Sequence, residues 1–553
     1  MADPVRVSFL GGLGEIGRNC AAIEVDGRIM LLDCGLMFPN LDMLGVDLVL
    51  PDFTYLRENA DRIEGCITTH GHEDHVGGLS FLLRDISFPI YGSALALGIA
   101  RNRIEEAGLL DRTELIPVVD GERRTIGPFD VEFIPVTHSV PHGFATAFHT
   151  PQGTILHSGD FKLDLTPVDG RLTDLARMGQ IAKDTGVRLL LADSTNAEEA
   201  GHSRSETSVG AVHYDLFHAH EGRRIITASF ASHVHRVQQI ADAAMAFDRT
   251  VATIGMSMKK NVQLARDLGL LRIPDHALRD IEDVDDLDPG KVCIISTGSQ
   301  GEPMSALALM ASGESRWLKL GPDDTVILSS HPIPGNEMNV SKVIDGLVRL
   351  GVEVVHSGIA DVHATGHAKA EELKTLHSVV RPEWFVPVHG EYRHLREHAK
   401  LAASMGTPED HILVCEDGDS ILLTDDGIVP TDSIPAGYLY VDGIVGDISH
   451  GVLRDRRVLA DEGVVVVVAA VDVVAGTVIT GPEVITRGWV HAPEAEELLE
   501  EATEVVRTAV ESALADGTRD VDGLQKVVRR AAGRFVNQRT KRRPMIVPVV
   551  MEA

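Results

Sequence analysis

Residues 69–78 read THGHEDHVGG, which places three histidines and two acidic residues within six consecutive positions. In an extended or tightly turned segment, residues two apart point to the same side, so His70 and His72 can bind one ion together. Asp74 and His75 then face a neighbouring ion. Imidazole suits zinc, while the added carboxylate leaves zinc and manganese open. The stretch therefore predicts a metal site.

Several apolar runs elsewhere in the chain end at a residue that binds metals in other proteins. The runs CITTH, FIPVTH, TILHSGD, LLLADS and WFVPVHG reach, in turn, His70, His138, Asp160, Asp193 and His389. Because strand ends that share one sheet edge lie together, these side chains can converge on one site. Asp160 is the best candidate for a bridging ligand, with His138 completing the first ion's set and His389 the second's. Two ions about 3.5 to 4 Å apart suit phosphodiester chemistry.

The chain divides by pattern into three parts. Residues 5–35 alternate short β-branched runs with turns, and the GLGEIG match to GxGxxG is interpreted as a structural turn, because a strand follows it rather than a helix. Residues 205–360 alternate strands and helices, which predicts a parallel sheet inserted into the first domain. The C-terminal module is predicted to contain strands at 452–460, 464–472, 484–490 and 545–550, with helices at 493–515 and 522–538.

Composition limits the class of protein. The chain has 553 residues, enough for two to four domains, and 44% hydrophobic residues, which fits a soluble globular protein. The five cysteines lack a CxxC pair, so neither a disulfide framework nor a thiolate zinc site is indicated. No secretion signal or membrane span is evident, and a cytoplasmic protein is expected. The net charge of −31 argues against a polyanionic partner unless positive charge is local.

The chain resembles the metallo-β-lactamase superfamily through HGHEDH, and within it the β-CASP nucleases through the inserted domain. More narrowly, it is similar to the ribonuclease J family, bacterial enzymes with 5′-to-3′ exonuclease and endonuclease activity on RNA. The similarity extends over almost the whole chain and is carried by stretches such as FLGGLGEIGRNC, LHSGDFKLD, SFASHVHRVQQ, HATGHA, PVHGEYRHL and KRRPMIVPVV.

The resemblance implies an α/β protein. It comprises a metallo-β-lactamase αββα sandwich, an inserted β-CASP parallel α/β domain and a small α+β C-terminal domain. The predicted boundaries are 1–204 and 359–440 for the sandwich, 205–358 for the insertion, 441–450 for a linker and 451–553 for the C-terminal domain.

The resemblance also implies roles for individual residues. One ion is held by His70, His72 and His138, the other by Asp74, His75 and His389, and Asp160 bridges them. The catalytic set is Asp74, Asp193 and His367, with His367 as general acid or transition-state stabiliser and Asp193 orienting its ring. A structural loop histidine is the alternative for His367.

Phosphate-binding elements of the family fall on Ser229, Ser232, His233, Arg236, His363, Thr365 and Gly366. The family commonly has serine at the position of Thr365 and asparagine at that of His233, so the end-group preference can differ here. For Ser229 and Ser232, plain helix capping is the alternative.

The expected cofactors are two divalent ions, zinc first, with Mn²⁺ or Mg²⁺ as alternatives. The expected partners are single-stranded RNA, in processing and decay, and further copies of the chain in a homodimer or homotetramer. Two ions bring four positive charges to an acidic protein. Basic residues cluster at Lys259 and Lys260 and again between Arg529 and Arg543, where RNA contact and subunit contact are equally open.

Three other functions are considered. A β-CASP enzyme acting on DNA tends to have valine where this chain has His389, which favours RNA. A small-molecule hydrolase of the superfamily does not need an inserted domain of roughly 150 residues, since ordinary loops are far shorter. A non-catalytic RNA-binding protein has no need of a complete ligand set.

Overall fold

The computed structural model describes residues 3–553 except 41, 285, 334, 444–445 and 491–495. The chain forms two compact units, one of residues 1–38 and 49–439 and the other of residues 39–48 and 440–553. Nothing in the sequence indicated that residues 39–48 group with the C-terminal region. Within the described residues, no helix has the length and apolarity needed to cross a membrane.

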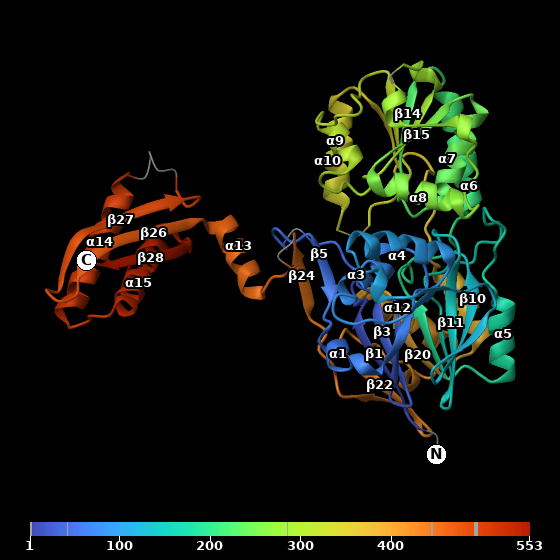
Figure 1. Ribbon diagram of the computed structural model, residues 1–553, viewed down its shortest axis with the longest axis horizontal. Helices are drawn as coiled ribbons and strands as arrows, with labels where there is room; N and C mark the ends of the chain where they lie inside the picture. Colours follow the sequence, from blue (N-terminus) through green and yellow to red (C-terminus); the bar gives the residue numbers. More distant parts are fainter. Residues whose placement is uncertain (1–2, 41, 285, 334, 444–445, 491–495) are drawn as a thin grey trace. The chain divides into compact units, whose positions relative to one another are not determined.

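Two sheets packed face to face form the centre of the first unit (Figure 1). Their strand orders are β23-β22-β1-β3-β4-β6-β7-β8 and β20-β13-β12-β11-β10-β9. The core between them contains Val5 and Phe9 from one sheet and Phe133 and Leu191 from the other, all at most 2% exposed. Helices α5, α11 and α12 pack on the outer face of the second sheet. The predicted αββα sandwich is therefore present.

The strands of the first sheet are β1 (Val5–Gly11), β3 (Cys20–Val25), β4 (Arg28–Leu32), β6 (Ile63–Ile67), β7 (Ile90–Gly92), β8 (Leu115–Pro117), β22 (Ser420–Thr424) and β23 (Gly427–Thr431). Those of the second are β9 (Arg123–Ile126), β10 (Phe129–Val136), β11 (Gly143–Thr150), β12 (Gly153–His157), β13 (Leu189–Asp193) and β20 (Trp384–Val388). Around them lie α1 (Thr54–Glu58), α2 (Glu73–Val76), α3 (Leu79–Leu82), α4 (Ala94–Glu106), α5 (Leu175–Asp184), α11 (Ala370–Val380), α12 (Tyr392–Ser404) and the short strands β2 (Leu13–Gly14), β5 (Leu48–Pro51) and β21 (Gly390–Glu391).

The inserted lobe has its own sheet, with strand order β16-β15-β17-β14-β18-β19 and parallel pairing throughout. Its β-branched strands are buried on both faces, as expected for a parallel sheet, and Ile226, Ile294 and Val326 are fully buried. The predicted strand and helix alternation is confirmed, while the boundaries at 204/205 and 358/359 stay predictions. Its elements are α6 (Glu206–Ala219), β14 (Arg224–Ala228), α7 (Val234–Ala246), β15 (Thr250–Ile254), α8 (Met256–Asp267), β16 (Leu278–Arg279), β17 (Val292–Ser296), α9 (Ala306–Ala311), β18 (Asp324–Leu328), α10 (Glu337–Arg349) and β19 (Glu353–Val355).

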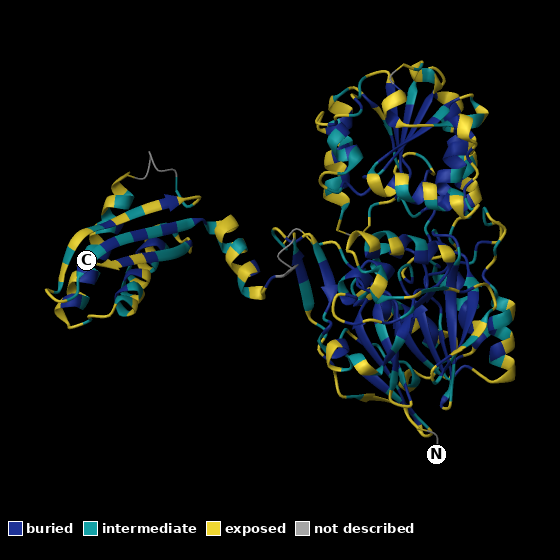
Figure 2. Ribbon diagram, viewed as in Figure 1, coloured by how far each residue is buried: buried dark blue, intermediate teal, exposed yellow. Residues whose placement is uncertain are grey.

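The second unit is built on a sheet of order β27-β26-β28, with two long helices on one face. Burial alternates along the central strand, and Val465 and Val467 contact the helices (Figure 2). Its elements are β24 (Tyr438–Asp442), β25 (Gly446–Asp447), α13 (His450–Glu462), β26 (Val464–Asp472), β27 (Thr477–Arg487), α14 (Glu496–Ala515), α15 (Val521–Thr540) and β28 (Met545–Glu552).

One secondary-structure prediction in this unit is wrong. Residues 452–460, expected as a strand, belong to helix α13, which is capped by the hydroxyl of Ser449. The run is rich in Leu, Arg and Ala, which favour helix over strand, and this composition outweighs its valines. The first residues of the expected helix at 493–515, and residues 444–445 of the expected linker, lie outside the described residues.

Candidate metal centre

The histidine-rich stretch follows strand β6 and turns directly into α2. Asp74 lies in the first turn of α2, and His75 is buried behind it. The turn is held against the loop after β4, where a Cβ on Gly35 would lie 1.6 Å from the backbone oxygen of Asp74. A side chain at position 35 would therefore push the ligand-bearing turn away. Asn19 also donates its backbone N–H to the Asp74 oxygen at 3.0 Å.

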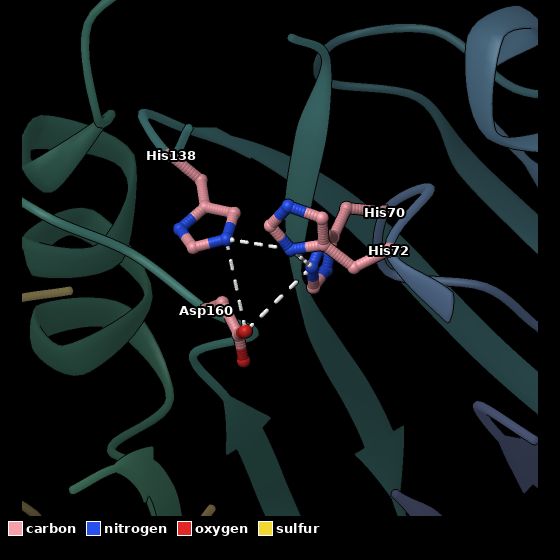
Figure 3. A group of neighbouring side chains, drawn as sticks. All are labelled: His70, His72, His138 and Asp160. Carbon is pink, nitrogen blue, oxygen red and sulfur yellow. Dashed lines mark hydrogen bonds and ion pairs between the residues drawn. The ribbon is translucent and has the colours of Figure 1, made fainter. Parts of the chain in front are cut away.

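Four side chains form a first ligand group (Figure 3). The Nδ1 atom of His72 lies 2.9 Å from Nε2 of His70 and 3.2 Å from Nε2 of His138. The Oδ2 atom of Asp160, from the loop after β12, lies 3.6 Å from Nε2 of His70 and 3.8 Å from Nε2 of His138. Residues up to 90 positions apart in sequence thus point at one centre.

A second ligand group lies beside the first, close to the Asp160 carboxylate. It consists of Asp74, His75 and His389, the last from the loop after β20. The Oδ2 atom of Asp160 lies 3.3 Å from Nε2 of His75 and 3.5 Å from Nε2 of His389. Asp160 therefore stands between the two groups, where a bridging ligand is needed.

The outer ring nitrogens of the histidines all have hydrogen-bond acceptors. His75 Nδ1 donates to Asp33 at 2.8 Å, and His138 Nδ1 donates to the Gly366 carbonyl at 2.7 Å. His389 Nδ1 lies 2.7 Å from the Thr195 hydroxyl. These bonds fix the tautomers of His75, His138 and His389 so that Nε2 of each presents a lone pair to the centre, as is usual for metal-binding imidazoles. His72 instead turns its Nδ1 inward.

This arrangement fits a pair of divalent cations. In the first group Nδ1 of His72 lies within hydrogen-bond distance of Nε2 of both His70 and His138. One proton on Nδ1 of His72 cannot serve both contacts, and a cation at the centre would satisfy all three nitrogens. Ligand atoms bound at about 2.0 to 2.2 Å around one zinc ion lie at similar mutual separations. The donor set of imidazole and carboxylate is also one that zinc and manganese accept.

The electrostatics of the site point the same way. Burial lowers the pKa of His72 to about 4 and holds that of His138 well below its usual value. Burial acts in the same direction on His389, but Asp160 and Asp193 outweigh it and raise the pKa of His389 to about 10. Neutral imidazole is the form that binds metal, so the first group is ready to bind. The raised pKa of His389 shows that the carboxylates favour positive charge beside them.

A histidine–aspartate pair adjoins the ligand groups. His367 Nδ1 donates to Oδ2 of Asp193 at 2.7 Å, and the His367 ring lies 4.9 Å from that of His138. Burial opposes the charged form of His367, yet Asp193 raises its pKa above the ordinary value. The ring is 19% exposed, so a proton on its other nitrogen can reach a substrate. The structure thus brings together the two residues that the sequence assigned to acid–base chemistry.

Two of the residues assigned to phosphate binding carry unused polar atoms. The Ser229 hydroxyl and Nδ1 of His363 are buried and have no hydrogen-bond partner among the described residues. Unpaired buried polar atoms are costly and therefore rare. Helix α7 is capped by His233, which accepts from the Arg236 backbone N–H, so neither Ser229 nor Ser232 serves as its cap.

Arg236 is placed differently from what a phosphate contact requires. Its side chain is fully buried, and its guanidinium donates to both carboxylate oxygens of Glu206 at 2.5 and 2.8 Å. The remaining donors reach the carbonyls of Ser329 and Val362 at 2.7 and 2.9 Å. Arg236 therefore supports the loop before His363 from behind instead of facing a ligand.

The last two assigned residues shape the loop that carries His367. The Thr365 hydroxyl accepts from the Asn196 side chain at 2.8 Å. A Cβ on Gly366 would lie 2.6 Å from the His138 ring, so only glycine lets this loop approach the ligand. Both residues thus position His138 and His367.

Sequence reasoning missed the residues that hold the ligands. Asp33 accepts from His75 Nδ1 and from the backbone N–H of Thr69, and Thr195 donates to Asp193 at 2.8 Å. The signal for Asp33 was present, because RIMLLD also ends an apolar run in an acid, as the ligand-bearing strands do. Thr195 follows Asp193 by two residues and offered no comparable signal.

Family models match most of the chain. They are the metallo-beta-lactamase superfamily at residues 13–202, the ribonuclease J beta-CASP domain at 222–347, the Zn-dependent metallo-hydrolase RNA specificity domain at 351–414 and the ribonuclease J C-terminal domain at 451–553.

Whole-length relatives agree with these models. The chain is 43% identical to ribonuclease J of Mycobacterium tuberculosis, over 99% of this chain and 97% of that protein. It is 40% identical to ribonuclease J 1 of Streptococcus pyogenes over 99% and 98%, and 38% identical to ribonuclease J2 of Bacillus subtilis over 100% and 99%. A crystal structure of a protein of unknown function from Enterococcus faecalis matches in fold, with a TM-score of 0.54 and 14% identity, covering 76% of this chain and all of that one.

Proposed function

Because the chain belongs to the ribonuclease J family, we propose that it is a metal-dependent ribonuclease that cleaves single-stranded RNA from the 5′ end and internally. The observation that carries the proposal is the pair of adjacent ligand groups with Asp160 between them, and His367 and Asp193 beside them. A phosphodiester is the substrate to which two adjacent cations and a nearby proton donor are suited.

The seven converging side chains are the proposed metal ligands. We place His70, His72 and His138 around one cation and Asp74, His75 and His389 around the other, with Asp160 between them. Five imidazoles favour zinc over magnesium, which prefers oxygen ligands, and manganese is the second choice. When bound, the two ions acidify a water molecule and neutralise charge on the scissile phosphate.

His367 is the proposed proton donor. Its Nδ1 N–H donates a hydrogen bond to Asp193, so Nε2 is the nitrogen that can face a substrate. Asp193 raises the pKa of His367 and so favours its protonated form, from which a proton can pass to the leaving oxygen. Asp193 keeps the ring oriented and stabilises its charged form.

A preference for a 5′-monophosphate is proposed for the polar side chains beside the His367 loop. The free Ser229 hydroxyl and His363 Nδ1 supply polar contacts, and His363 becomes a stronger donor when a phosphate favours its protonated form. Burial lowers the pKa of His363 to about 3 in the absence of an anion. Arg236 acts by holding this loop.

Positive charge outside the metal centre is limited. Lys259 and Lys260 face Asp280 and Glu106 and are neutralised by them. At the C-terminus, Arg539 and Arg542 pair with Glu501 and Glu462. The remaining cations of helix α15 are exposed, and RNA contact or subunit contact by them stays a prediction.

A homodimer or homotetramer is proposed through the C-terminal sheet. The face of β26 turned away from α14 and α15 bears Val466 and Val468, and its neighbours on the same face include Ile485, Val549 and Met551. The last three are 40%, 36% and 50% exposed. An apolar sheet face of this kind is typical of a surface that a second copy covers. Light scattering of the Val549→Asp variant should show smaller particles than the unmodified protein.

The activity is tested with 5′-labelled RNA and a matched DNA, each with and without chelator. Release of mononucleotides from monophosphorylated RNA, lost on chelation, is the expected result. Cleavage of DNA only, or turnover of a chromogenic β-lactam without nuclease activity, would overturn the proposal.

A further inference from the structure

Three distant segments of the chain meet at one buried carboxylate, that of Glu372 in the first turn of α11. Its Oε1 accepts from the backbone N–H of Leu163 at 2.8 Å and from the Ser203 hydroxyl at 2.7 Å. Its Oε2 accepts from the backbone N–H of Ser203 at 2.6 Å and from that of Lys369 at 2.9 Å. The side chain is fully buried, and no ion pair to it is found among the described residues.

Each of these segments leads to the reaction centre or to the inserted lobe. Leu163 follows Asp160 by three residues, and Lys369 follows His367 by two. Ser203 lies where the chain passes into the inserted lobe, just before α6. The first and third segments also touch directly, because Ala368 donates its backbone N–H to the Phe161 carbonyl at 2.7 Å.

Local helix capping accounts for only part of this arrangement. The bond from Lys369 belongs to a capping box at the start of α11, a common local motif. The other three bonds reach residues 169 and 209 positions away in sequence. A cap needs none of them, so they serve to join segments.

The four hydrogen bonds to the Glu372 side chain require a carboxylate. Each oxygen accepts two hydrogen bonds. Three of the four donors are backbone N–H groups, which cannot act as acceptors. A glutamine amide presents one NH₂ group, which faces a backbone N–H in either orientation. The substitution Glu372→Gln therefore keeps the size of the side chain but replaces attraction by donor–donor repulsion.

We propose that Glu372 is a positioning residue for RNA cleavage. It fixes the His367 loop against the Asp160 loop and against the first crossover into the inserted lobe. The proton donor therefore keeps its position relative to the metal centre. The inference rests on the proposed function and adds a residue that touches neither metal nor substrate.

The test is a graded series of variants assayed on 5′-monophosphorylated RNA. Glu372→Gln should lower kcat by about 10- to 100-fold, the usual size of losses when supporting partners of a site are removed or misplaced. KM and bound metal per chain should stay unchanged. Glu372→Asp should recover part of the rate because it keeps the charge, and Ser203→Ala, which removes one bond of four, should lose less than threefold. The matched control is Glu371→Gln, whose side chain is 45% exposed and pairs with Lys374.

Hydrogen exchange supplies a readout that does not depend on catalysis. In Glu372→Gln, peptides containing Leu163, Ser203 and Lys369 should exchange faster together, while peptides of the C-terminal sheet should not change.

Four results would decide against the proposal: unchanged kcat in Glu372→Gln, equal loss in the Glu371→Gln control, loss of metal in parallel with kcat, or exchange confined to Lys369. If Glu372→Gln fails to fold, an unchanged kcat in both Glu372→Asp and Ser203→Ala would also overturn it. Absence of RNA cleavage by the unmodified protein would instead refute the proposed function.

Discussion

The metal centre and the Arg236 cluster are both buried groups of charged residues in the same unit, but their internal pairing differs. Around Asp160, Nδ1 of His72 lies 2.9 and 3.2 Å from two other ring nitrogens, and one proton cannot serve both contacts. Around Arg236, each donor meets an acceptor, with Glu206 opposite the guanidinium. A cation would complete the first group, whereas in the second the guanidinium donors already have acceptors. Unmatched buried atoms therefore indicate a binding site better than buried charge does.

The largest expected effect concerns the metal centre. His72→Ala removes a ligand from the first group and should reduce RNA cleavage by about 1,000-fold or more, since metal activation lowers the pKa of water from about 15.7 to about 7. Metal analysis of His72→Ala should show fewer than two ions per chain. The control is His202→Ala, an exposed histidine outside both ligand groups. Full activity in His72→Ala would show that the first group binds no catalytic metal.

The sequence predicted which side chains converge, because candidate metal ligands are recognised by residue type and by their place at strand ends. His138, Asp160 and His389 each end an apolar run, and the sheets bring those ends together. The residues that hold the site in place were harder to predict. Asn19, Thr195 and Glu372 are of common types, and they have partners that lie far away in sequence. Arg236 was assigned to phosphate because its buried partner Glu206, 30 residues earlier, could not be inferred from spacing.

The next effect concerns the Arg236 cluster. Glu206→Gln leaves the Arg236 charge buried without its partner and should destabilise the inserted lobe by about 3 to 5 kcal/mol, the usual cost of breaking a buried ion pair. Hydrogen exchange in α7 during urea unfolding measures this loss. The double variant Glu206→Gln with Arg236→Met should lose less than the sum of the single variants. If Arg236→Met instead abolishes the 5′-monophosphate preference without loss of stability, Arg236 contacts the phosphate and the contrast between the clusters fails.

A smaller effect separates proton transfer from metal binding. His367→Ala should slow cleavage by about 100-fold or more, the usual contribution of a positioned acid. The metal content should remain that of the unmodified protein, because the groups around His72 and His75 keep all their members, and His367 lies only in a third group with Asp160 and His389. Single-turnover cleavage and metal analysis of one preparation make the distinction. A matching fall in bound metal would mean that His367 is itself a ligand.

The smallest effect concerns a residue behind the ligands. Asp33 accepts from His75 Nδ1 at 2.8 Å and so fixes the tautomer that turns Nε2 toward the centre. Asp33→Asn keeps the shape, but its amide can face the ring with a donor, which favours the wrong tautomer. Metal affinity should fall by about 10- to 100-fold, as is usual for such outer partners. Competition with a chelator measures it, and activity should return at saturating metal. The control is Asp26→Asn, an exposed turn residue. Unchanged affinity would mean that His75 is oriented by α2 alone, and that the ligand groups owe their geometry to the backbone and not to side-chain partners.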